Sequence, residues 1–146
     1  MKVFKFDKNL NEKFTDDVKR IKLKNDDGFN KIILNNPSDS NNMCIINSLK
    51  LYTFDRIKEA QIIISSILND PNTAIKIGSI NILCVSFGIS EKENILLEEI
   101  CVEKDNKIDI LCNKFLIILP DGSFVLKLDR IINFAEMEIE IIEEKI

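Results

Sequence analysis

The chain has 146 residues, of which 45% are hydrophobic and 30% charged, and its formal net charge is −4. This length and composition suit one folded domain spanning residues 1–146 and exclude extensive disorder. The sequence contains no histidine. That absence excludes Ser-His-Asp and Cys-His catalysis, histidine zinc sites and histidine-based pH switching.

Charge is distributed unevenly along the chain. Residues 1–73 carry a net charge of +2 and residues 74–146 a net charge of −6, and the only arginines are Arg20, Arg56 and Arg130. An acidic chain with few arginines is poorly suited to bind a phosphate backbone, so we expect no nucleic-acid partner. A charged partner of the second half is expected to be basic.

The first residues carry no targeting signal. Residues 1–14 lack an apolar segment with a small-residue cleavage site, and no apolar run reaches the ~18 residues of a membrane span. We therefore expect a cytoplasmic protein. The stretch 7–18 partly matches a calcium loop, but Glu12 replaces the required glycine and Val18 the bidentate glutamate, so no metal site is expected there.

The first half contains a strand–turn–strand pattern. Residues 18–24 alternate isoleucine and leucine with lysine, and the turn 25–28 separates them from the apolar run 29–34. Turn residues between two alternating runs are typical of a β-hairpin. The following stretch, 35–42, consists of polar and turn-forming residues and is expected to be a loop.

Two segments could form helices. Over residues 54–69, apolar side chains recur at helical spacing, which favours a helix over the alternative of a strand at 62–64. Residues 90–101 begin with the spacing of a capping box but lack its hydrophobic staple, so helix and strand both stay open. Between these segments, residues 75–87 predict one long strand or two, with Gly78 at a bend.

Further turns are expected in the second half. Residues 105–107 separate the runs 100–103 and 108–112. Pro120, Asp121 and Gly122 separate the apolar runs 115–119 and 124–128. Proline fixes φ and glycine permits positive φ, so this pattern indicates a second hairpin.

The C-terminal segment 136–141 alternates strictly between acidic and apolar residues, which predicts a strand with one acidic face, followed by a free tail. Such a strand could be a sheet edge protected by charge, or an edge that pairs with a partner strand whose surface is basic. This strand is the candidate interaction surface; its residues are Glu136, Glu138, Ile139, Glu140 and Ile141.

No other pattern predicts chemistry. The four cysteines, Cys44, Cys84, Cys101 and Cys112, form no CxxC pair, and the four glycines lie too far apart for a phosphate loop. No catalytic residue, metal ligand or cofactor site is predicted.

The expected fold is mainly β, an antiparallel β-sandwich or β-roll with one or two short helices; the alternative is α+β. We predict a non-enzymatic protein–protein interaction or assembly module that self-associates or inhibits a partner protein. The alternatives are a β-fold that binds a small apolar ligand and a histidine-free enzyme that uses carboxylates.

Overall fold

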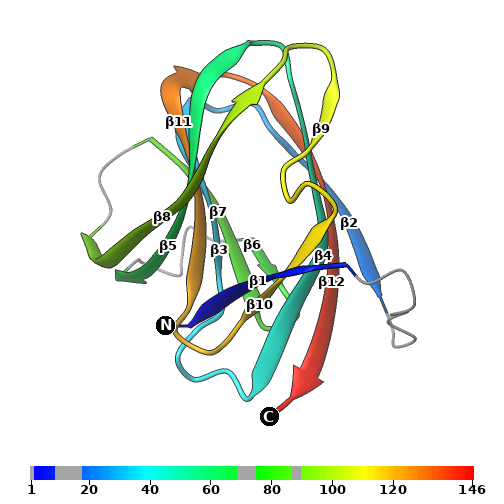
Figure 1. Cartoon of the computed structure of the whole chain (residues 1–146), viewed down its shortest axis with the longest axis vertical. Helices are drawn as coiled ribbons and strands as arrows, with labels where there is room; N and C mark the ends of the chain where they lie inside the picture. Colours follow the sequence, from blue (N-terminus) through cyan, green and yellow to red (C-terminus); the bar gives the residue numbers. More distant parts are fainter. Residues whose placement is uncertain (1, 9–17, 69–74, 87–89) are drawn as a thin grey trace.

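The computed structural model describes residues 2–8, 18–68, 75–86 and 90–146. These residues form twelve β-strands and no helix (Figure 1). In chain order the strands are β1 (Val3–Asp7), β2 (Lys19–Asn25), β3 (Phe29–Asn35), β4 (Asn42–Thr53), β5 (Ile57–Leu68), β6 (Ile75–Ile77), β7 (Ile80–Val85), β8 (Ser90–Val102), β9 (Lys107–Asp109), β10 (Lys114–Ile118), β11 (Ser123–Ile132) and β12 (Ala135–Lys145).

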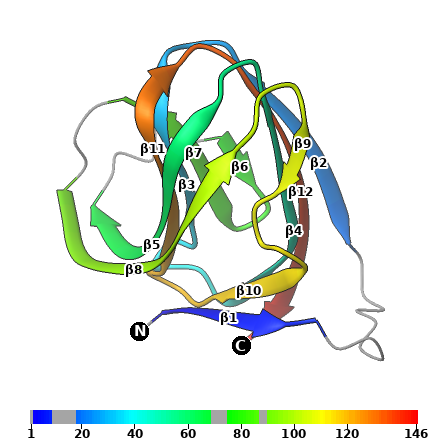
Figure 2. The same cartoon turned by 45° about the horizontal axis from the view of Figure 1, so that its top comes forward.

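The strands form two antiparallel sheets, which confirms the expected sandwich-like β architecture. Sheet A has the order β1-β10-β4-β12-β2, and β9 also pairs with β4. Sheet B has the order β6-β7-β3-β11-β5-β8. The two sheets face each other across the interior (Figures 1 and 2).

The core lies between the sheets and follows from the alternation of side chains along each strand. In β12, Ala135, Met137, Ile139 and Ile141 are all buried, whereas the glutamates between them face outward. The inward residues of both sheets belong to one hydrophobic cluster, in which isoleucine and leucine predominate over aromatic residues. β-branched side chains suit this pleated, densely packed interior.

The expected hairpins were wrong because their turns connect the two sheets. The strands on either side of residues 120–122, β10 and β11, lie in sheets A and B respectively. Likewise, β2 pairs with β12 in sheet A, whereas β3 pairs with β7 and β11 in sheet B. The turn at residues 103–106 also crosses between sheets, from β8 to β9.

The helix expected over residues 54–69 was also wrong. β5 occupies this segment and pairs with β11 and β8. Ile62, Ile63 and Ile64 are all buried, which means that both faces of β5 are covered in this part of the strand. A strand buried on both faces shows no period of two, so its apolar residues can match helical spacing by chance. The ambiguous segment 90–101 is a strand, β8.

Side chains fix the loops at the end of the sandwich that holds the termini. Buried Asn36 donates hydrogen bonds to the carbonyls of Asn42 and Ile118 (both 2.9 Å), which joins the loop after β3 to strands of sheet A. Residues 75–85 form two strands, β6 and β7, which pair around Gly78. Glu143 accepts hydrogen bonds from the Ser79 N–H (2.6 Å) and hydroxyl (3.1 Å), so β12 holds this turn in place.

Candidate interaction surface

β12 is not an edge strand, so the expectation of an acidic sheet edge was wrong. It lies inside sheet A, paired with β4 on one side and β2 on the other. The expected free tail after Ile141 was wrong too, since β12 continues to Lys145 and Ile142 is buried. β4 and β2 hydrogen-bond to the two edges of β12, so neither edge is available to a partner strand along the paired residues.

The three outward glutamates of β12 form a ladder of ion pairs with basic residues of the neighbouring strands. The register of β2 places Arg20, Lys22 and Lys24 directly opposite them, and Lys107 of β9 approaches from the other side. Opposite charges at such cross-strand positions attract. We call these seven residues the glutamate ladder; its ion pairs are Lys24–Glu136 (3.4 Å), Lys22–Glu138 (3.5 Å), Lys107–Glu138 (2.7 Å) and Arg20–Glu140 (3.3 Å).

Neighbouring donors favour the ionised form of two of these carboxyls. The pKa of Glu138 is lowered mainly by the hydrogen bond from Lys107, with a further contribution from the charge of Lys22. The pKa of Glu140 is lowered mainly by the hydrogen bond from Asn47 (2.9 Å), and also by Arg20. Asn47 reaches this carboxylate from a β-bulge in β4, where the register shifts by one residue. Both acids are therefore ionised and paired at neutral pH.

The structure separates the five residues expected at the interaction surface into two groups. Glu136, Glu138 and Glu140 share the outer face of sheet A, whereas Ile139 and Ile141 are buried in the core. The two isoleucines hold the strand in place and cannot contact a partner. The glutamates are reachable from outside, but their charge is already compensated by the lysines and arginine of the ladder.

A shallow groove of about 320 Å³ runs over the ladder on the outer face of sheet A. Lys50 of β4 lines this groove and forms no ion pair with the residues that the structure describes. The other residues that line the groove belong mainly to the glutamate ladder. The side chains between the two sheets pack into the shared core. The groove is an outer surface feature and not an apolar cavity between the sheets.

Two groups of stacked aromatic rings extend to the surface, although Phe115 of the second group is itself buried, and the sequence-based reasoning missed both. Phe54 stacks on Phe134 with ring centroids 4.4 Å apart, and Tyr52 meets Phe54 edge-on at 5.8 Å. Phe54 is 56% exposed. We call these three residues the apical aromatic cluster, because the turns after β4 and β11 carry it at the end of the sandwich away from the termini (Figure 1).

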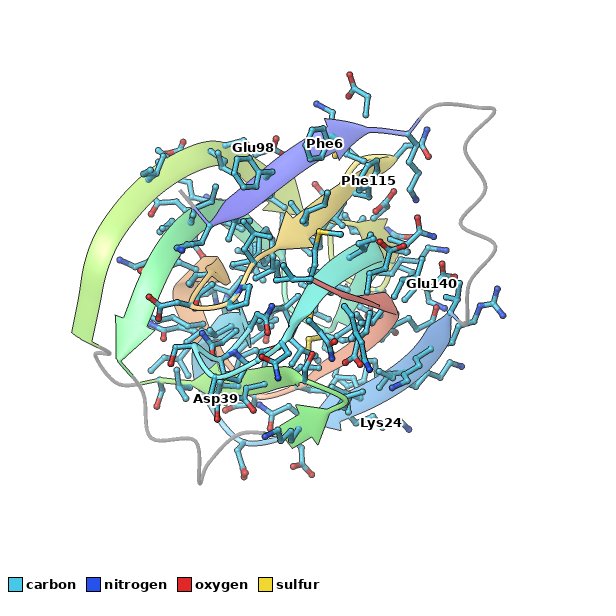
Figure 3. The ribbon with its side chains drawn as sticks, turned by 90° about the horizontal axis from the view of Figure 1, so that it is seen from below. Phe6, Lys24, Asp39, Glu98, Phe115 and Glu140 are labelled. Atoms are coloured by element: carbon cyan, nitrogen blue, oxygen red, sulfur yellow. The ribbon has the colours of Figure 1, made fainter. Side chains whose placement is uncertain are left out.

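The second group lies near the other end of sheet A. Phe4 and Phe6 of β1 stack in a row with Phe115 of β10, at centroid distances of 6.5 Å and 5.4 Å. Figure 3 shows Phe6 beside Phe115, at a distance from Glu140 and Lys24. We call these residues the phenylalanine row. The alternation of phenylalanine with other residues in 3–7 is the sequence signal that could have revealed it.

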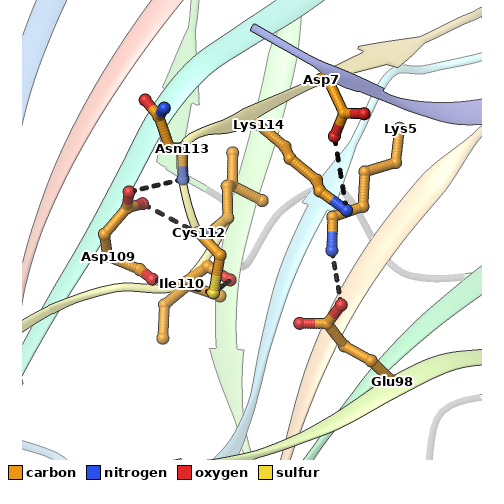
Figure 4. Close-up of polar contacts among 9 residues, drawn as sticks. Lys5, Asp7, Glu98, Asp109, Ile110, Cys112, Asn113 and Lys114 are labelled. Atoms are coloured by element: carbon orange, nitrogen blue, oxygen red, sulfur yellow. Dashed lines mark hydrogen bonds and ion pairs between the residues drawn. The ribbon is translucent and has the colours of Figure 1, made fainter.

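Asp109, Cys44 and Cys84 belong to the structural part of the molecule. The carboxylate of Asp109 accepts hydrogen bonds from the N–H groups of Leu111 (3.2 Å) and Asn113 (2.9 Å), which fixes the turn before β10 (Figure 4). Burial raises the pKa of the Cys84 thiol to about 11, and burial likewise raises that of Cys44. In the described ranges, no three acidic, cysteine or histidine side chains gather as a metal ion would require.

The calcium-loop pattern that the sequence analysis rejected falls mostly in residues 9–17, outside the described residues. The described part of the chain has no helix with the length and apolar character needed to cross a membrane. Comparison with protein-family models, curated proteins and solved structures found no match to this chain.

Proposed function

We propose that this chain is a non-enzymatic protein–protein interaction or assembly module, folded as one domain and acting in the cytoplasm. The observation that carries the proposal is the exposure of stacked aromatic rings outside the core, foremost Phe54 on Phe134. Aromatic side chains bury a large area on contact and are enriched where partners meet. The four cysteines are free thiols, as a reducing compartment maintains them.

The chemistry of the outer faces supports a protein partner over the alternatives. Enzymatic use of carboxylates requires acids with a raised pKa in a cleft, whereas Glu138 and Glu140 have lowered pKa values and are ion-paired. A nucleic-acid partner requires unpaired cations, whereas the basic residues of the ladder are engaged by glutamates. An apolar ligand requires a cavity, whereas the inward side chains form one continuous core.

The partner contact is therefore proposed at the aromatic surfaces and not at the glutamates of β12. An inhibitor that uses its acidic strand to block a basic site would need free carboxylates. Because each glutamate of the ladder already has a cationic neighbour, an electrostatic partner would have to displace it. Aromatic rings with one face in water gain free energy by burial without breaking an existing pair.

The test compares the full chain with Phe54→Ser and with Phe6→Ser, and uses Lys58→Ser on the exposed part of β5 as the control. Light scattering after size-exclusion chromatography gives the mass in solution, and affinity capture under identical conditions gives the retained partners. A defined oligomer, or a stoichiometric partner whose affinity falls roughly tenfold or more in one of the phenylalanine variants, supports the proposal. The proposal is overturned if the chain is a monomer and captures no partner whose binding depends on these rings.

A further inference from the structure

Over the described residues the two sheets present five edge strands, and four of them carry features that oppose pairing with another chain. Edge strands expose unpaired N–H and C=O groups, and proteins protect them with charge, shortness or irregularity. β2 carries exposed Lys19, Arg20, Lys22 and Lys24, and β6 and β9 are each three residues long. β8 exposes Ile95, Leu96 and Leu97, but its register with β5 shifts at three places, and a strand with bulges is a poor template for pairing.

β1 is the edge that lacks these protections. Its register with β10 runs without a shift from Val3 to Asp7, and it contains neither proline nor glycine. Within the described ranges, only β10 pairs with it. Phe4 and Phe6, both exposed, point outward beside Phe115. Over the described residues this edge therefore has an unshifted register, an apolar outer face and no second strand partner.

The inward charge of β1 does not protect this edge either. Lys5 points to the interior and is 13% exposed, and a lysine in this position ordinarily opposes strand pairing. Here its ammonium lies 2.6 Å from the carboxylate of Glu98 on β8 (Figure 4). This ion pair neutralises Lys5 and joins the edge of sheet A to the edge of sheet B.

We infer that β1 pairs antiparallel with β1 of a second copy of this chain, about a two-fold axis at Lys5, so that sheet A continues across the dimer. This inference rests on the proposed assembly function and assigns its contact and its partner. The segment Val3–Asp7 is self-complementary about Lys5, because Phe4 of one copy then lies opposite Phe6 of the other. The second copy thus continues the phenylalanine row with its own rings.

The paired strands are complementary on the outer face, and on the inner face the two Lys5 residues lie opposite each other, each already paired with Glu98 of its own copy. On the outer face, two Phe4–Phe6 cross-strand pairs form between the copies, and aromatic pairs are among the most favourable such pairs. On the inner face, the Asp7 of each copy lies diagonally opposite Lys5 of the other, at a Cα distance of about 7–8 Å. Lys2 and Lys8 meet only at the two ends of the pair, where solvent and salt screen their repulsion. The contact is short, so the dimer depends on protein concentration.

The first experiment measures the mass of the full chain by sedimentation equilibrium over a range of concentrations. The native chain is expected to form dimers, and Phe6→Lys is expected to weaken the dimer tenfold or more by giving β1 an exposed charge like those of β2. The matched control is Ile131→Lys, which places the same charge on an exposed apolar residue of β11 in sheet B and leaves the dimer unchanged. Circular dichroism confirms that both variants are folded.

A second experiment tests the register without relying on a disruptive change. In a chain with Cys101→Ser and Cys112→Ser, Phe4→Cys and Phe6→Cys are prepared as separate proteins and mixed under mild oxidation. Directly opposite cysteines have the Cα separation of roughly 4.4–6.8 Å that a disulfide requires, whereas two copies of the same variant lie farther apart. The mixture is expected to cross-link well above either variant alone.

Three results overturn the inference: equal cross-linking by the mixture and by single variants, a dimer that Phe6→Lys leaves intact, or a monomer at every concentration. A dimer lost in Leu96→Lys but retained in Phe6→Lys moves the contact to β8 and leaves the proposed assembly function standing. A monomer that still retains a partner through Phe54 also leaves that function standing. A monomer that retains no partner overturns both.

Discussion

At the turn between β6 and β7, Gly78 has a φ of +58°, in the left-handed region that residues with a Cβ rarely adopt. A Cβ added there would also overlap the carboxylate of Glu143, which holds Ser79. Gly78→Ala should therefore lower the free energy of unfolding by roughly 1–3 kcal/mol, measured by urea denaturation. Gly28→Ala is the control, because its nearest neighbours are side-chain atoms at 3.3 Å and 3.5 Å; an equal loss in both variants would contradict this account.

The cysteines should divide into two reactivity classes. Cys101 and Cys112 are exposed, whereas Cys44 is buried and Cys84 partly so. The thiolate is the reactive form, and burial raises the pKa of the Cys84 thiol to about 11 and that of Cys44 as well. A thiol reagent at neutral pH should label Cys101 and Cys112 rapidly, and the other two only after denaturation. Mass spectrometry of the labelled peptides measures the order, and rapid labelling of Cys44 in the folded chain would show this burial to be wrong.

At the scale of the strand, the glutamate ladder should make the free energy of unfolding fall as the pH falls. The folded-state pKa values of Glu138 and Glu140 are lowered, so their contribution is present above the unfolded value of about 4.5 and is lost as pH falls through the lower folded value. Glu140→Gln should destabilise the chain at pH 7 by at most about 1 kcal/mol, since solvent screens this exposed pair. The difference should shrink in acid.

Urea midpoints of the native chain and of Glu140→Gln at both pH values measure this effect. Glu144→Gln is the matched control, since that carboxylate makes no ion pair among the described residues. If Glu140→Gln lowered the free energy of unfolding by the same amount at pH 7 and at acid pH, the loss would come from the shape of the side chain and not from its charge.

The positions of strands and turns could be predicted from the sequence better than the pairing between the strands. The alternation in residues 136–141 correctly indicated which side chains of β12 are buried, because period two is a local property. It could not indicate that β12 is central, since edge and interior strands with one outer face share the same alternation. The turn at residues 120–122 was likewise recognisable, but the same proline–glycine chemistry serves a hairpin and a crossing between sheets.

The glutamate ladder and the two aromatic groups likewise could not be predicted from local sequence patterns. The cationic partners of Glu136 and Glu140 lie more than a hundred residues away in sequence, in β2, so no local pattern joins them. Phe54 and Phe134 meet because the turns after β4 and β11 adjoin in space. An interaction surface assembled from distant segments follows from topology, and topology was the part of the fold that the sequence left open.

For the molecule as a whole, the crossing connections make each sheet depend on the other. β12 is the last strand in the chain, yet it lies between β4 and β2 and contributes Met137, Ile139 and Ile141 to the core that both sheets share. Sheet A therefore cannot form its central hydrogen bonds until β12 is present. Without β12, the inner face of sheet B also loses part of the surface that covers it. Unpaired strands with exposed apolar residues are prone to aggregate.

A chain ending at Phe134 should consequently show no cooperative unfolding transition, whereas a chain lacking only Lys145 and Ile146 should keep one. Ile146 is 77% exposed, so the shorter deletion removes little of the core. Far-UV circular dichroism during heating distinguishes the two, because loss of tertiary pairing removes the sigmoidal change. If the chain without β12 unfolded cooperatively, sheet B would be stable by itself. The shared core would then be a contact between two independent units and not the structure that holds both together.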